Sequence, residues 1–376
     1  MKKNKSDILD YIDWRGDLSF EAAPFGDVDS LILCQLSYLN FSGLVSKSFE
    51  ESTSLFEVSK LFFASSDFER RSKLGFFIDP ATLELLKKAS ESKRFGNIGV
   101  CGFVSEHDEQ KEEQFSAVTF ILDESSMLGR GLVYLAFRGT DDTLIGWKED
   151  FNLAFMSEVP AQKDAVLYLE RAALNFRKSD IISGGHSKGG NLAIYSAAHV
   201  NEKIKRRIQK VYNFDGPGFS QAVLDSDDFF SIKTKINSFY PQFSIVGMLF
   251  HHYDFYKSVL SDEKLLMQHN PFSWFVKGKT FETKEELDSG SGIFFRSFNA
   301  WFEKLSSYQR EQFVETLFSL LEATNAQTNS ELLGNVLKNA PKILKAFAKL
   351  DSEIRDDATH IAADFIKIIA KESVNH

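Results

Sequence analysis

The fold of this chain is decided by Ile181-Ile182-Ser183-Gly184-Gly185-His186-Ser187-Lys188-Gly189-Gly190, which stands near the middle of 376 residues. Ile181 and Ile182 are typical of a short strand, and the small and apolar residues of 191–200 favour a helix. A serine between glycines at such a junction indicates a sharp turn that exposes its hydroxyl. The glycines fit this turn, because its strained backbone brings the strand and the helix too close for side chains.

A glycine-rich junction between a strand and a helix can also bind phosphate through the helix N-terminus. The junction has neither the GxGxxG nor the GxxxxGKS/T spacing of nucleotide-binding loops. We therefore interpret Ser187 as a nucleophile. The positive end of the following helix then favours negative charge on the reacting oxygen.

The segments around this junction alternate between strand and helix patterns. Residues 132–137 are apolar almost without interruption, which is typical of a central strand buried on both faces. Residues 98–104 and 115–122 flank a short charged stretch and are expected to form an antiparallel hairpin. Further strands are expected at 179–185, 210–214 and 236–240, and helices at 162–178 and 191–200. This order predicts the α/β class, with an α/β-hydrolase fold whose mostly parallel central sheet carries helices on both faces.

Helical patterns dominate both ends of the chain, over residues 6–90 and again over 293–376. We therefore expect three parts. An N-terminal helical segment at 1–94 packs on the core, an α/β-hydrolase core occupies 95–285, and a C-terminal helical segment occupies 286–376.

The composition is that of a globular protein, with 43% hydrophobic and 26% charged residues and 37 Phe to fill a core. The net charge of −9 argues against nucleic-acid binding, which needs a basic surface to neutralise phosphates. Only Cys34 and Cys101 are present, which fits a reducing compartment. No signal-peptide pattern and no stretch of about 18 apolar residues is found. We expect a cytoplasmic protein with no integral membrane segment, no nucleic-acid partner, no metal and no cofactor.

Hydrolysis through a serine also needs hydrogen-bond donors for the oxyanion. One is expected to be the backbone N–H of Lys188, the residue after the nucleophile. The other is expected from the loop after the 132–137 strand, where Gly139 lets the backbone turn and Thr140 offers both its N–H and its hydroxyl. The alternative is that this loop is a plain β-turn.

Two motifs of the chain resemble those of class 3 lipases: residues 136–140, Ala-Phe-Arg-Gly-Thr, and residues 185–193, Gly-His-Ser-Lys-Gly-Gly-Asn-Leu-Ala. In that family the residue after the Arg-Gly pair helps to form the oxyanion hole, and it corresponds to Thr140. The usual residue after the nucleophile there is Leu, whereas this chain has Lys188.

A second resemblance covers nearly the whole chain. It is to an uncharacterised bacterial family of α/β-hydrolase-like proteins, a domain of unknown function called Mbeg1-like. The segments that carry it are residues 8–17, 137–151, 213–219, 244–249 and 268–274. The resemblance implies the fold and the hydrolase assignment, and it implies no substrate.

The general base is expected to follow the nucleophile in the chain. His269 lies in an irregular Gln-His-Asn-Pro stretch, and loops commonly carry catalytic groups. The class 3 lipase pattern also has a histidine a few residues before a tryptophan, here Trp274. We take His269 as the base. His252 is the alternative, and a purely structural histidine is the third interpretation.

The acid is harder to place. In the class 3 lipases it follows the strand that corresponds to residues 236–240, where this chain has Pro241-Gln242-Phe243-Ser244 and no carboxylate. Asp254 is our candidate, and the Ser244 position itself is an alternative. Asp215 is another alternative, although capping of the turn at 216–218 is the favoured interpretation of that residue. A Ser–His dyad is also open, because an amide, hydroxyl or carbonyl can orient the imidazole less strongly.

These residues predict an esterase or lipase-like acylhydrolase that acts on a small acyl-ester or lipid-like substrate. A peptidase or thioesterase would use the same groups and differ in the leaving group. The alternative from another class is a non-catalytic binding or scaffold protein on a hydrolase fold, which the missing acid and the helical ends favour.

Overall fold

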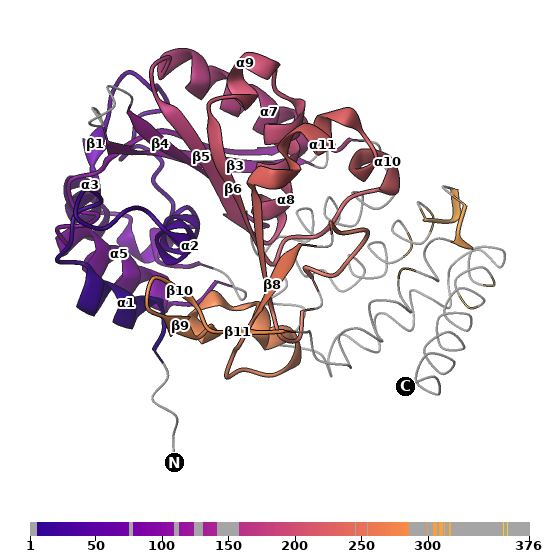
Figure 1. Ribbon diagram of the computed structural model, residues 1–376. Coiled ribbons are helices and arrows are strands. Elements are labelled where there is room, and N and C mark those ends of the chain that lie inside the picture. The colour runs from indigo at the N-terminus through magenta and orange to yellow at the C-terminus, as the bar shows by residue number, and fades with distance from the viewer. Residues whose placement is uncertain are drawn as a thin grey trace.

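The computed structural model describes residues 6–74, 78–108, 113–123, 131–140, 158–244, 246–253 and 255–285, with isolated positions between 299 and 359. Its centre is one twisted sheet with helices on both faces (Figure 1). Most of the expected C-terminal helical segment at 286–376 lies outside the described residues.

Within this described part the sheet has nine strands in the order β1-β2-β3-β4-β5-β6-β7-β8-β11. The strands from β4 to β8 pair in parallel, and the pairs at both edges are antiparallel. The strands are β1 (Thr53–Ser54), β2 (Gly99–Asp108), β3 (Glu113–Asp123), β4 (Leu132–Phe137), β5 (Asp180–His186), β6 (Ile208–Phe214), β7 (Ile236–Pro241), β8 (Tyr256–Val259) and β11 (Thr283–Lys284), and β9 (Val276–Lys277) and β10 (Thr280–Phe281) form a separate pair. The mostly parallel sheet and the β2–β3 hairpin confirm the predicted fold class.

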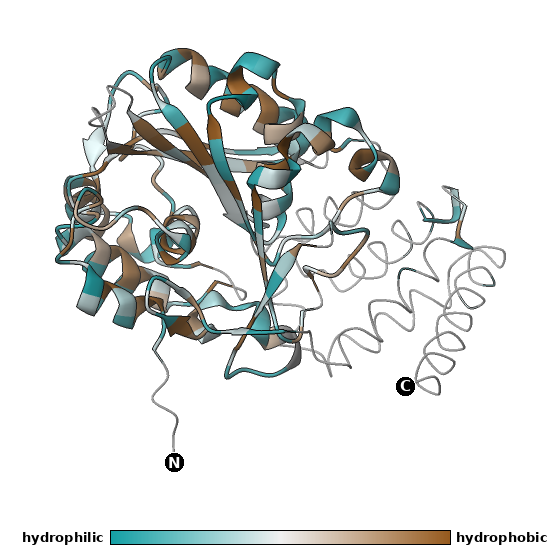
Figure 2. Ribbon diagram, in the orientation of Figure 1, coloured by the Kyte–Doolittle hydropathy of each residue, from teal (hydrophilic) through white to brown (hydrophobic). Residues whose placement is uncertain are grey.

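Two hydrophobic cores lie on the two faces of this sheet. The helices α1 (Ile8–Arg15), α2 (Asp27–Leu36), α3 (Leu55–Phe63) and α5 (Ala81–Glu91) contribute to one core. The helices α7 (Pro160–Asn175), α8 (Lys188–His199) and α11 (Asp227–Ile232) contribute to the other. Short helices complete the layers: α4 (Phe68–Arg71), α9 (Glu202–Lys205), α10 (Gln221–Leu224), η1 (Lys233–Lys235), η2 (Leu265–His269) and η3 (Pro271–Ser273). Figure 2 shows hydrophobic residues concentrated on the central strands, as burial on both faces requires.

The N-terminal helices are fixed to each other by a buried ion pair. Arg94 donates to both carboxylate oxygens of Asp29, each at 2.6 Å, and both side chains are fully buried. The Tyr11 hydroxyl donates to the same carboxylate at 3.0 Å. Because a charge buried without its partner costs several kcal/mol, this cluster ties α1, α2 and the end of α5 into one layer on the sheet.

Candidate active site

Ser187 lies at the turn between β5 and α8, where the sequence predicts it. Its φ of 58° and ψ of −136° are rare for a residue with a side chain. The turn is held by two backbone hydrogen bonds of 2.9 Å, from Ser187 N–H to the Phe214 carbonyl and from Gly190 N–H to the Ser187 carbonyl. The Ser187 side chain does not cap α8, so its hydroxyl is not used by the helix that it precedes.

The glycines of the motif are required by close backbone approach. A Cβ at Gly185 would overlap the backbone of Gly189, and a Cβ at Gly189 would overlap the Phe137 carbonyl at the end of β4. A Cβ at Gly190 would overlap the side-chain oxygen of Asn213 on β6. The strand, the turn and the first turn of α8 therefore form one tightly packed elbow.

The expected oxyanion residues border this elbow. A Cβ at Gly139 would lie 2.9 Å from the Ser187 Cβ, so the backbone that leads to Thr140 runs directly beside the serine, and Thr140 itself is buried. Lys188 is the first residue of α8, and the first N–H groups of a helix have no acceptor inside it. The buried Lys188 side chain turns away toward β3, where Nζ donates to the Gln114 carbonyl at 2.9 Å.

His269 ends η2 and is held by the carboxylate of Asp215. Nδ1 of His269 and Oδ2 of Asp215 are 2.6 Å apart. The other carboxylate oxygen, Oδ1, accepts the Ser244 hydroxyl at 2.5 Å. Because a carboxylate accepts from Nδ1–H, the other ring nitrogen, Nε2, is left as the basic one. The indole of Trp274 donates to the Gln268 carbonyl at 2.8 Å and so fixes the segment that carries His269.

The position of Asp215 differs from its favoured sequence interpretation. The side chain that caps the turn after β6 is Asn213, whose Oδ1 accepts the Gly216 N–H at 2.9 Å. Asp215 is fully buried with φ at 53°, and this left-handed backbone directs its carboxylate to His269 instead. Asp254, the sequence candidate for the acid, lies outside the described residues. Ser244 follows β7, where the lipase resemblance places the acid, and its hydroxyl donates to the Asp215 carboxylate.

His186 and Tyr38 are part of the site and were not singled out from the sequence. His186 Nε2 lies 2.8 Å from the His269 carbonyl oxygen, and the centres of the two imidazole rings are 4.4 Å apart. His186 Nδ1 lies 3.0 Å from the hydroxyl of Tyr38, which follows α2. Burial lowers the pKa of His186 well below 6.5, and the neighbouring His269 lowers it further. Burial therefore favours the neutral form of this elbow histidine, and both of its ring nitrogens have hydrogen-bond partners.

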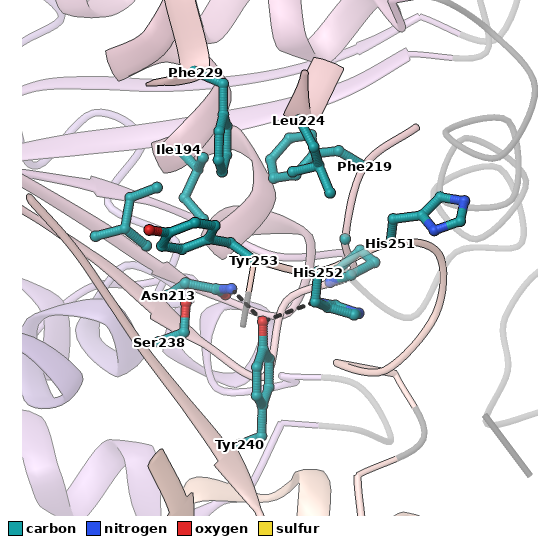
Figure 3. A pocket seen from close by; sticks show the side chains of 13 residues that line it. Ile194, Asn213, Phe219, Leu224, Phe229, Ser238, Tyr240, His251, His252 and Tyr253 are labelled. Carbon is teal, nitrogen blue, oxygen red and sulfur yellow. Dashed lines mark hydrogen bonds between the residues drawn. The ribbon is translucent and has the colours of Figure 1, made fainter. Parts of the chain in front are cut away.

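His252, the alternative base, belongs to a different group of side chains. Its Nδ1 lies 3.1 Å from the Tyr240 hydroxyl and its Nε2 lies 3.1 Å from the Leu249 carbonyl. Figure 3 shows His252 and Asn213 converging on the Tyr240 hydroxyl at a small cavity whose lining includes neither Ser187 nor His269. Burial lowers the pKa of His252 to about 4.

The hydrogen bonds of the described residues include none that joins the Ser187 hydroxyl to His269. His186, which precedes Ser187 in the chain, bonds the His269 backbone and so links the elbow to the segment that carries His269. Catalytic hydrogen bonds are often long in ligand-free enzymes and shorten when substrate binds.

In the described residues no cluster of three or more His, Cys, Asp or Glu side chains has the arrangement of a metal site. Among these residues, too, no helix combines the length and apolarity needed to cross a membrane.

A family model with the description Mbeg1-like matches residues 89–319, more than half of the chain. The chain belongs to the Mbeg1-like family. The range that matches the Mbeg1-like model contains the elbow, Thr140, Asp215 and His269, whereas Tyr38 lies before it. A comparison with curated proteins found no match for this Mbeg1-like chain.

Several solved structures similar to this Mbeg1-like protein are named lipases. M37 lipase is 15% identical with a TM-score of 0.35, over 58% of this chain and 68% of that chain. A mutant form of MDLA from Penicillium cyclopium is 11% identical with a TM-score of 0.37, over 70% and 87% of the two chains. The Rhizomucor miehei lipase–propeptide complex is 14% identical with a TM-score of 0.33, over 64% and 78%.

Proposed function

We propose that this Mbeg1-like protein is a serine hydrolase that acts on ester bonds, with Ser187 as nucleophile, His269 as base and Asp215 as the acid. The observation that carries the proposal is the 2.6 Å contact between His269 Nδ1 and Asp215 Oδ2, on a histidine whose backbone is bonded to the elbow of Ser187. A nucleophile on a strained turn and a base oriented by a third group are the arrangement that acyl transfer through serine requires.

In the proposed reaction the Ser187 hydroxyl attacks the acyl carbon of the ester, and its proton passes to His269 Nε2. Asp215 stabilises the imidazolium through the Nδ1–H bond. The negative oxygen of the tetrahedral intermediate is bound by the N–H of Lys188 and by Thr140. The C–O bond to the leaving alcohol breaks as His269 returns the proton to that oxygen, and water then hydrolyses the acyl-serine by the same steps.

Asp215 replaces Asp254 as the proposed acid because of its contacts. Both of its carboxylate oxygens have partners, one of which is the ring that it must orient. The Ser244 position then has a supporting role, since its hydroxyl donates to Asp215. A Ser–His dyad is not needed when a carboxylate already occupies Nδ1 of the histidine.

The proposed substrate is a small acyl-ester or lipid-like molecule, and a thioester or amide differs only in the leaving group. We place the protein in the cytoplasm, because Cys34 and Cys101 are both buried free thiols and fit a reducing compartment.

A non-catalytic binding or scaffold role is the competing proposal. The lack of a direct Ser187–His269 hydrogen bond within the described structure favours it.

Hydrolysis of p-nitrophenyl butyrate tests the proposal against that competitor. We expect turnover by the wild type and a fall of at least about 10³-fold in Ser187→Ala. Ser196→Ala is the matched control, because Ser196 lies in the same helix α8 and its hydroxyl donates to the Ala193 carbonyl. Equal rates in the wild type and Ser187→Ala would favour the scaffold role.

A further inference from the structure

We propose that Tyr38 and His186 are positioning residues that hold the His269 segment against the elbow, so that Tyr38 links the N-terminal helical layer to the position of the base. This inference rests on the proposed hydrolase function. Neither side chain binds substrate or transfers its protons. The helices before residue 89, where the family match begins, have a role beyond packing in this proposal.

The direction of the hydrogen-bond chain follows from the chemistry of its members. The partner of His186 Nε2 is the His269 carbonyl oxygen, 2.8 Å away, and a carbonyl oxygen only accepts. Nε2 must therefore carry the hydrogen. In the neutral ring that burial favours, Nδ1 has a lone pair and accepts the Tyr38 hydroxyl at 3.0 Å. The chain thus runs from Tyr38 O–H to His186 Nδ1, and from His186 Nε2–H to the His269 carbonyl.

The neutral state of His186 matters for the base beside it. The two imidazole rings lie 4.4 Å apart between centres, so a charge on His186 would directly oppose the charge that His269 acquires when it takes the serine proton. His186 is 4% exposed, and burial in this position disfavours its charged form. The elbow therefore offers His269 a hydrogen-bond donor without offering it a competing cation.

Tyr38 is held where it can fix this ring. It is 6% exposed and follows α2, a helix that packs directly on β5. A Cβ at Gly139 would overlap the Tyr38 hydroxyl, which places that hydroxyl between the elbow and the loop that leads to Thr140. The same hydroxyl also lies 3.3 Å from the His186 carbonyl oxygen. Movement of α2 would therefore displace His186 and, through it, His269.

A second link joins the N-terminal layer to the other side of His269. The next residue, Asn270, donates from Nδ2 to Asp79 Oδ2 at 2.7 Å. Asp79 also accepts the Ala81 N–H at 2.9 Å, so it is fixed at the start of α5. The His269 segment is thus bonded to the layer through His186 on one side and through Asn270 on the other.

The test measures how fast a fluorophosphonate labels Ser187 in the full chain, followed by mass spectrometry. Tyr38→Phe removes the hydroxyl, and His186→Leu removes both ring nitrogens. We expect labelling to slow about 10-fold in Tyr38→Phe and about 100-fold in His186→Leu, the usual range for loss of a supporting hydrogen bond. His186→Gln should recover about 10-fold over His186→Leu, because the glutamine amide can still donate to the His269 carbonyl.

Tyr11→Phe is the matched control, since it removes a buried tyrosine hydroxyl from the same layer that is bonded to Asp29. Its labelling rate should stay within about twofold of the wild type, although the variant should unfold at a lower urea concentration. Folded Tyr38→Phe and His186→Leu proteins that label at the wild-type rate would overturn the inference. A wild type that is not labelled at Ser187 would instead overturn the proposed hydrolase and, with it, any positioning role.

Nitrogen NMR of the wild-type imidazoles tests the chain even if the variants do not fold. We expect His186 to be neutral with its hydrogen on Nε2. A hydrogen on Nδ1, or a charged ring at pH 7, would contradict the direction of the chain and overturn the proposal.

Discussion

The Nδ1–H of His269 donates to Oδ2 of Asp215 at 2.6 Å, across 54 residues of sequence. Asp215 reaches this position because it follows β6 with a left-handed φ of 53° and is buried completely. Asn213 takes over the capping of the next turn, which leaves the carboxylate to the histidine and to Ser244. The proposed acid thus lies one strand earlier in the sheet than the resemblance to class 3 lipases implies.

Asp215→Asn tests this assignment. The amide can donate its N–H to Nδ1 and so stabilise the wrong tautomer of His269, which removes the lone pair from Nε2. We expect kcat for p-nitrophenyl butyrate to fall by about 10³-fold or more, with the fold intact by circular dichroism. Asp254→Asn is the control and should stay close to the wild type. The reverse pattern would identify Asp254 as the acid.

Ser244→Ala removes the donor to Asp215 Oδ1 and leaves a buried carboxylate oxygen without that bond. We expect unfolding in urea to show a loss of about 1–3 kcal/mol, the cost of an unsatisfied buried charged acceptor. Ser231→Ala is the comparison, because its exposed hydroxyl donates to the Asp228 carbonyl and should contribute less than about 0.5 kcal/mol. Equal stability of the two variants would show that Ser244 does not support Asp215.

Gly189→Ala tests the packing of the elbow, because a Cβ there would overlap the Phe137 carbonyl and neither backbone can yield easily. We expect a loss of about 3 kcal/mol or more, or failure to fold. Gly26→Ala is the control, since the nearest atom to its Cβ would be the Lys279 carbonyl oxygen at 3.4 Å. It should cost about 1 kcal/mol or less. A stable Gly189→Ala protein would contradict the described contact between α8 and β4.

We expect the folded chain to lose stability as the pH falls below about 6.5, which is above the pH range in which carboxylates take up protons. Burial lowers the pKa of His252 to about 4 and that of His186 well below 6.5 in the folded chain. The unfolded chain therefore binds more protons than the folded one below about pH 6.5, so stability falls as the pH drops from there toward the folded values. For His252 alone we expect a loss of about 2 kcal/mol between pH 7 and pH 5 in urea unfolding. His252→Gln should flatten this dependence, and an unchanged slope would contradict burial of a neutral His252.

Local patterns explain which parts of the molecule could be predicted. The sequence predicts the elbow because its glycines are required by contacts between residues close in the chain, such as Gly185 and Gly189. The sequence also predicts the β2–β3 hairpin and the β4 strand, because each has a residue pattern within a single strand. The short strands β8 and β11, of four and two residues, are too brief to carry such a pattern.

The contacts that complete the site could not be predicted in the same way. Tyr38 and His186 are 148 residues apart, and their bond depends on how α2 packs against β5. An aspartate after a strand commonly caps the turn that follows, so the sequence favours that role for Asp215. The backbone conformation at Asp215 determines whether its carboxylate caps the turn or contacts His269. No local sequence pattern predicts that conformation.

The most direct test of the proposed hydrolase is to locate the site of fluorophosphonate attachment in the full-length wild-type chain. Tandem mass spectrometry should find one adduct, on Ser187, and no adduct there in His269→Gln, because the serine then lacks the base that takes its proton. An unlabelled Ser187 in the wild type, or equal labelling with and without His269, would contradict the assignment of Ser187 as a nucleophile activated by His269.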